Sequence, residues 1–144
     1  MHDVHSARQA AEQGRLEDWV HAYLSSGAWA DPAFVAGLRR QRRWWLGPLC
    51  LPLVAVTRVC GPEPDLEYPQ APVRWEAKVA AMAAEISDPL ALPPFITEYR
   101  DGTLSLRDGN HRHEALRRRG VTEFWAIVWC NSAADAEAAA MRLR

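Results

Sequence analysis

The stretch that decides the fold is PFITEYRDGTLSLRDGNHRHEALRRRG, from Pro94 to Gly120. Two short apolar runs flank the Asp-Gly pair at 101–102, which favours the positive φ angles of a tight hairpin turn. The second run ends in the polar turn Asp-Gly-Asn at 108–110, and a helical pattern follows it. The sequence therefore predicts a β-hairpin whose second strand passes through a glycine turn into a helix that ends at Gly120.

Cations crowd the start of this helix, because His111, Arg112 and His113 follow the turn directly. A helix start already carries free N–H groups and a partial positive charge, so the pattern predicts a negatively charged partner. Gly109 would let the backbone approach such a ligand, and Arg112 offers a planar two-pronged donor suited to phosphate. The alternative is an ordinary turn, capped by Asn110 or Asp108, with solvated histidines and Arg112 paired to an acid.

The first third of the chain, residues 1–46, is predicted to form two or three helices. Gly14 separates the first helix from a second one with an apolar face at helical spacing. Asp31 and Pro32 mark the start of a third, which the arginines and Gly47 are expected to end. The apolar face of the second helix comprises Leu16, Trp19, Val20 and Tyr23.

The remaining segments predict a mixed arrangement. Residues 49–60 are expected to form a strand, 61–72 a proline-rich loop, 73–87 an amphipathic helix, 123–130 a central buried strand and 132–144 an alanine-rich helix capped by Ser132. We therefore expect an α+β fold, with a helical N-terminal extension at 1–46 and a second domain at 47–144.

The segment from Leu51 to Cys130 resembles the ParB/sulfiredoxin-like superfamily, most specifically in DGNHRHEAL. The resemblance implies a small mixed sheet with flanking helices. It also implies that a nucleotide's phosphates lie on the helix start, where Gly109 and Arg112 match the glycine and arginine of the family motif.

Two departures from the family pattern narrow the expected activity. Sulfiredoxins carry a catalytic cysteine where this sequence has Asn110, whose amide cannot act as a thiolate nucleophile. Partition ParB proteins carry a Gly-Glu-Arg-Arg turn and a following DNA-binding domain, for which we expect no room after residue 130. The motif is closer to Asp-Gly-x-x-Arg members, which include small-molecule kinases and proteins described as ParB-like nucleases.

The resemblance thus predicts binding of ATP, ADP or CTP through Gly109, Asn110, His111, Arg112 and His113. Magnesium at Asp108, with Asp108 and His111 as catalytic groups, would support hydrolysis of the nucleotide or phosphoryl transfer to a small-molecule acceptor. The acids of the proline-rich loop, Glu63, Asp65 and Glu67, are further candidates for the metal. Two alternatives are a non-enzymatic module of the same fold that docks protein or DNA, and a nuclease.

The composition of the chain restricts the expected binding partners and cellular location. The net charge of −1 gives no general attraction to nucleic acid or anionic membranes. Three scattered cysteines and the lack of a long apolar run favour a cytoplasmic protein without a membrane anchor. The patch at 39–45 (RRQRRWW) would either bind nucleic acid or anchor a helix end on the sheet, and the tryptophan-rich extension is compatible with a homodimer.

Overall fold

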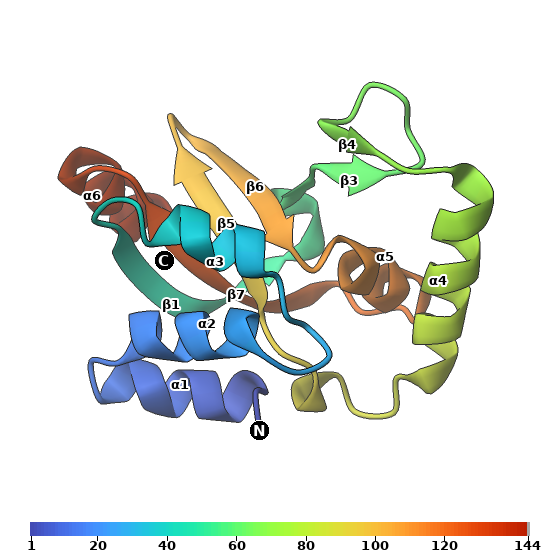
Figure 1. The fold of residues 1–144 in the computed structure, drawn as a ribbon, viewed down its shortest axis with the longest axis horizontal. Coiled ribbons are helices and arrows are strands. Elements are labelled where there is room, and N and C mark those ends of the chain that lie inside the picture. Colours follow the sequence, from blue (N-terminus) through green and yellow to red (C-terminus); the bar gives the residue numbers. More distant parts are fainter. Residues whose placement is uncertain (144) are drawn as a thin grey trace.

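The predicted hairpin is confirmed. In the computed structural model, which describes residues 1–143, β5 (Phe95–Arg100) and β6 (Thr103–Asp108) pair antiparallel around a turn in which both residues have positive φ. The hairpin belongs to a mixed five-stranded sheet of order β1-β7-β5-β6-β2 (Figure 1). Its other strands are β1 (Trp44–Pro52), β2 (Thr57–Arg58) and β7 (Glu123–Cys130).

Helices cover both faces of the sheet, which makes three layers (Figure 1). One layer is formed by α1 (Val4–Glu12), α2 (Leu16–Ser25) and α3 (Pro32–Leu38). The other is formed by α4 (Pro72–Glu85), α5 (Asn110–Arg118) and α6 (Ala133–Arg142), the last capped by Ser132 as predicted. Shorter elements are β3 (Cys60–Gly61), β4 (Tyr68–Pro69) and the 3-10 turns η1 (Leu53–Ala55) and η2 (Pro89–Ala91).

Strand β7 is central and apolar on both faces because each face meets a different helical layer. Phe124, Ala126 and Val128 pack in the core beneath α4, α5 and α6, whereas Ile127 and Trp129 pack beneath α2 and α3. Successive side chains of a strand point to opposite faces, so both sets must be apolar when both faces are covered. The mixed α+β class predicted from the sequence is therefore present.

The third helix is shorter than predicted, and the residues after it form a strand. The Asp31 carboxylate caps the helix by accepting a hydrogen bond from the Phe34 N–H at 3.2 Å, as expected. The helix nevertheless ends at Leu38, where the Arg43 guanidinium donates to the carbonyls of residues 37 and 38. Residues 44–46, expected to be helical, lie in β1 opposite β7.

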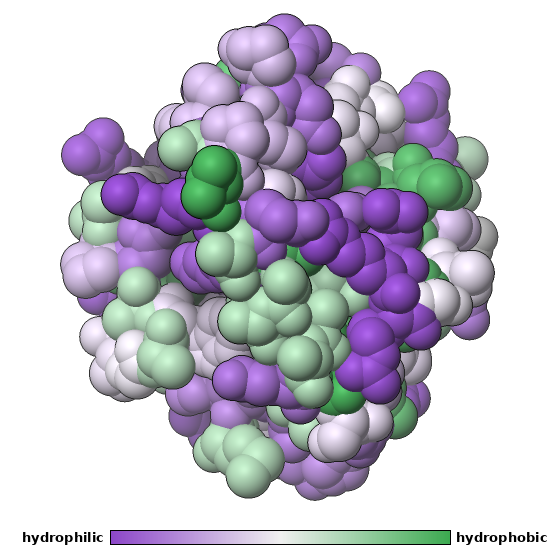
Figure 2. All heavy atoms as spheres, turned by 90° about the vertical axis from the view of Figure 1, so that its right-hand side faces the viewer, coloured by the Kyte–Doolittle hydropathy of each residue, from purple (hydrophilic) through white to green (hydrophobic). Residues whose placement is uncertain are grey.

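The strand predicted at 49–60 is also divided. It contains the end of β1, the turn η1 and the short strands β2 and β3. The predicted amphipathic helix forms as α4, which buries Trp75 and Val79. Figure 2 faces α4 and shows moderately hydrophobic side chains among strongly hydrophilic ones, as expected for the outer side of a surface helix. In the part of the chain described, none of the helices is long and apolar enough to cross a membrane.

Candidate functional site

Gly109 makes the turn between β6 and α5. Its φ of +113° is a conformation that glycine adopts readily, and a Cβ there would lie 2.8 Å from Cδ1 of the buried Phe95. Gly109 is itself the N-cap residue, and no side chain of the described part of the chain caps the helix, so the predicted capping by Asn110 or Asp108 is wrong. The first helical bond runs from the His113 N–H to the Gly109 carbonyl at 2.8 Å, which leaves the earlier N–H groups without a helical acceptor.

The Asn110 side chain holds the turn against the segment between β2 and β3. Its Oδ1 accepts hydrogen bonds from the N–H groups of Val59 and Cys60 at 3.0 and 3.2 Å. Its Nδ2 donates to the Leu106 carbonyl at 3.0 Å. Because the amide is used in this way, only the backbone of Asn110 remains suited to a ligand.

Arg112 is buried, with 2% of its surface exposed, and only part of its guanidinium is paired. Nη2 donates to the Pro94 carbonyl at 3.1 Å and to Asp108 Oδ2 at 3.3 Å, and the group lies 4.6 Å from the centre of the Trp29 ring. Nε is buried without a hydrogen-bond partner among residues 1–143. Arg112 therefore combines a structural ion pair with unused donor capacity, and unpaired buried donors are costly.

Asp108 is held from the opposite helical layer by Tyr23 of α2. The Tyr23 hydroxyl donates to Asp108 Oδ2 at 2.7 Å. Burial, followed by the negative charge of Asp108, raises the pKa of Tyr23 far above its ordinary value, although the positive charge of Arg112 opposes this. The Tyr23 hydroxyl therefore stays protonated and remains a hydrogen-bond donor. Asp108 Oδ2 accepts hydrogen bonds from both Tyr23 and Arg112.

The two histidines of the motif lie in different surroundings. His113 is 8% exposed, and its Nε2 lies 2.8 Å from the Leu53 carbonyl, so it belongs to the core. His111 is half-buried, with its ring 4.6 Å from the Trp75 ring and Nε2 3.2 Å from the side-chain oxygen of Gln70. Burial, with the positive charges of Lys78, Arg112 and Arg58, lowers the pKa of His111 to about 4. His111 is therefore neutral near pH 7.

We expect a direct consequence for stability. Between pH 6.5 and about 4 the unfolded chain protonates at this position and the folded protein does not, so stability falls as pH is lowered through that window. His111→Gln should therefore lose less stability than the parent between about pH 7 and about pH 5 in urea unfolding. The pKa of His113 is also lowered, but this changes the pH dependence of stability equally in the variant and the parent. Its effect therefore cancels when the two proteins are compared. An NMR titration midpoint of His111 at its ordinary value would contradict the prediction.

Three adjoining cavities open around the turn. The turn cavity, about 640 Å³, is lined by the residues from Arg107 to His111 with Asp31, Val59 and Tyr68 among others. The inner cavity, about 180 Å³, reaches Arg112, Trp29 and again Asp108. The apolar cavity, about 360 Å³, is lined by Trp29, Lys78, Ala81, Met82, Glu85, Ile86 and Leu92.

Lys78 of α4 lines all three cavities, and sequence reasoning gave it no role. On the helical pattern it belongs to the exposed face of α4, where charged residues are ordinary. One signal was present in the sequence, since Lys78 is the only lysine among 17 basic residues. Tyr23, Trp29 and Phe34 were also missed as neighbours of the turn.

The residues present suit magnesium only when a phosphate group completes its coordination. Within residues 1–143 there is no group of three or more His, Cys, Asp or Glu side chains that could hold a metal ion. Asp31 and Asp108 line the turn and inner cavities together, and magnesium is commonly bound by one or two carboxylates with substrate phosphates. The loop acids are engaged elsewhere or exposed, since Glu63 pairs with Arg58 at 2.7 Å and Glu67 with Arg107 at 2.6 Å.

Comparison with known proteins adds no assignment. No protein-family model matches the chain, and no curated protein matches it. The resemblance to the ParB/sulfiredoxin-like superfamily therefore stays a prediction based on the residues of the turn and its flanking elements.

Proposed function

We propose that the protein binds a nucleotide whose phosphates lie at the start of α5. The observation that carries the proposal is the meeting of three sets of donors at the inner cavity. These are the uncapped N–H groups after Gly109, the partly unpaired Arg112 guanidinium, and the Lys78 ammonium. Free N–H groups at a helix start together with fixed cations favour an oxyanion.

The apolar cavity suits the nucleobase. It shares Trp29, Lys78 and Met82 with the inner cavity, so one ligand can extend from the start of α5 into it. The indole and thioether give a flat apolar surface on which a base can stack. The Glu85 carboxylate at its wall is an acceptor for an exocyclic amine, as carried by the bases of ATP, ADP and CTP.

Phosphoryl transfer or nucleotide hydrolysis is the reaction class that we infer for this site. Asp31 and Asp108 would hold magnesium, which neutralises phosphate charge when bound. His111, neutral near pH 7, can accept a proton from an attacking hydroxyl or water. The negative charge of a bound phosphate would raise the pKa of His111 from about 4 and so favour this role.

Lys78→Met is expected to weaken nucleotide binding about tenfold, because a charge-assisted contact to phosphate is lost. Lys78 is exposed, so the stability without ligand should change little. The measurement is the melting temperature with ATP, ADP or CTP, each with and without magnesium. Tenfold weaker binding removes about 1.4 kcal/mol of ligand-dependent stabilisation at saturating nucleotide.

Arg74→Met is the matched control, since Arg74 is exposed on α4 one turn earlier and lies outside the three cavity walls. It should retain the full ligand-dependent shift. If both variants lose the shift equally, the nucleotide is attracted only by general positive charge. If no nucleotide stabilises the parent, the proposal is wrong.

A further inference from the structure

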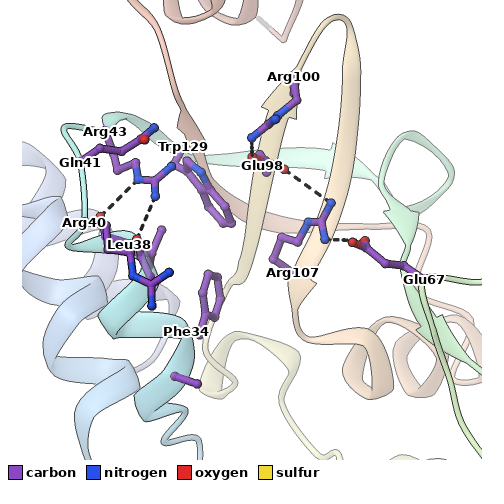
Figure 3. Close-up of a pocket in the computed structure, with 12 residues that line it drawn as sticks. Phe34, Leu38, Arg40, Gln41, Arg43, Glu67, Glu98, Arg100, Arg107 and Trp129 are labelled. Atoms are coloured by element: carbon purple, nitrogen blue, oxygen red, sulfur yellow. Dashed lines mark hydrogen bonds and ion pairs between the residues drawn. The ribbon is translucent and has the colours of Figure 1, made fainter.

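A larger cavity lies on the same side of the sheet as α3, beyond the nucleotide site. This arginine cavity, about 710 Å³, lies between α3 and the polar face of the β5–β6 hairpin (Figure 3). Its hairpin wall consists of Glu98, Arg100 and Arg107, which alternate with core residues of the same strands. The three N-terminal helices cover the apolar positions of β5 and β7 on this face. These helices leave the polar positions of the hairpin uncovered, and Glu98, Arg100 and Arg107 line the arginine cavity.

The walls of the arginine cavity carry more positive than negative charge. Four arginines (40, 43, 100 and 107) face two glutamates (67 and 98). Glu98 is 8% exposed, and its oxygens already accept from Arg100 at 2.8 Å and lie 3.5 Å from Arg107 Nη2. Arg107 also pairs with Glu67.

The two remaining arginines have no carboxylate partner within residues 1–143. Arg43 donates only to neutral groups, namely two carbonyls of α3 and the side-chain oxygen of Asn131. Arg40 is exposed and makes no ion pair within the described residues. The charge of Glu98 acts on Arg43 without a direct ion pair, and the same carboxylate already pairs with Arg100 and Arg107. The concave, partly apolar surface therefore keeps an excess of positive charge, which favours an anionic ligand.

Aromatic side chains form the apolar part of this cavity. Trp129 is 5% exposed and packs against Phe34, with ring centres 5.4 Å apart. Both rings lie between Arg40 and Arg43 on one side and the arginines of the hairpin on the other (Figure 3). The Trp129 indole N–H is buried and has no hydrogen-bond partner among residues 1–143. A buried donor of this kind is costly unless an acceptor reaches it.

We propose that the arginine cavity is a second ligand site, which binds a small organic anion with a flat body. The carboxylate or phosphate monoester of the ligand would contact Arg40 and Arg43, and its flat part would lie on the partly exposed Phe34 ring, next to the buried Trp129. The site shares Phe34 and Arg107 with the turn cavity, so its ligand would lie next to the nucleotide. Binding in the arginine cavity does not depend on the nucleotide, because none of the contacts of this ligand uses the start of α5.

A nucleic-acid strand fits this cavity less well. Stacking of successive bases needs exposed ring faces along a groove, whereas Trp129 is almost fully buried. Binding of a polyanion also depends on general positive charge, and the net charge of the chain is −1.

The test uses benzoate and phenyl phosphate as separate probes of the carboxylate and phosphate chemistries. The indole N–H signals of the 7 tryptophans are followed by NMR, and Trp129→Phe identifies the signal of Trp129. At least one probe should shift this signal saturably. Arg40→Gln should weaken binding about threefold, while Arg39→Gln, at the neighbouring exposed residue outside the cavity wall, should not.

Lys78→Met separates the two sites, because a probe in the arginine cavity binds this variant as well as the parent. The proposal is overturned if neither probe shifts the Trp129 signal, or if Arg39→Gln and Arg40→Gln weaken binding equally. It is also overturned if an oligothymidylate strand binds much more tightly than both probes and shifts the same signal, since the cleft would then be a nucleic-acid surface.

Discussion

Arg112→Ala is expected to lower the free energy of unfolding by about 3 kcal/mol and to abolish nucleotide-dependent stabilisation. The guanidinium is buried between Asp108, the Pro94 carbonyl and the Trp29 ring, so its removal leaves a void and an acceptor without its donor. The Asp108 carboxylate would lose its guanidinium partner and keep the hydrogen bond from the Tyr23 hydroxyl. Removing the buried partner of a part-buried ion pair is costly for this reason.

A double-mutant cycle with Asp108→Asn separates the contribution of the ion pair from the other causes of destabilisation by Arg112→Ala. Asparagine keeps an acceptor for Tyr23 but carries no charge, so Arg112→Ala should cost about 1 kcal/mol less in that background. Urea unfolding of the four proteins gives the coupling energy. A cost below about 1 kcal/mol for Arg112→Ala in the parent would mean that the guanidinium is solvated, contrary to its burial.

Gly109→Ala should destabilise the protein by about 3 kcal/mol, from two additive causes. The backbone conformation at φ +113° is strained for any residue with a Cβ, and the new methyl group would meet Phe95 at 2.8 Å and Arg112 Nη2 at 3.0 Å. Phe95 is fully buried, so its ring cannot move aside without disturbing the core.

Gly120→Ala is the matched control for backbone strain alone. Gly120 has φ +80°, but a Cβ there would meet nothing within 4 Å. It should cost about 1 kcal/mol, so the difference between the two variants measures the close packing of the turn. If urea unfolding gives equal costs for the two substitutions, the turn at Gly109 has room for a side chain. The close packing of this turn against Phe95 and Arg112 would then be contradicted.

The parts of the fold that were predicted from the sequence depend on local signals. The hairpin follows from its Asp-Gly turn, α4 from its apolar spacing, and α6 from Ser132, which accepts a hydrogen bond from the Asp135 N–H. These signals act between neighbours in the chain, so they persist whatever the tertiary surroundings.

The parts that were missed depend on distant partners. Trp44 lies opposite Cys130 in the sheet, and this pairing outweighs the helical preference of the preceding segment. The histidines of the motif are two residues apart, or roughly 200° around a helix, so one faces the cavities and the other the core. Their chemical type could be read from the sequence, but their surroundings could not.

The contact between Tyr23 and Asp108 joins residues 85 positions apart and has a thermodynamic consequence. The helix α2 supplies the hydroxyl that contacts Asp108, and the loop after it supplies Trp29, whose ring lies against the Arg112 guanidinium. If a nucleotide binds at the turn as proposed, and detachment of these helices lowers its affinity, reciprocity requires that the nucleotide strengthen their attachment by the same factor. The amide protons of α2 would report that coupling as slower exchange with solvent.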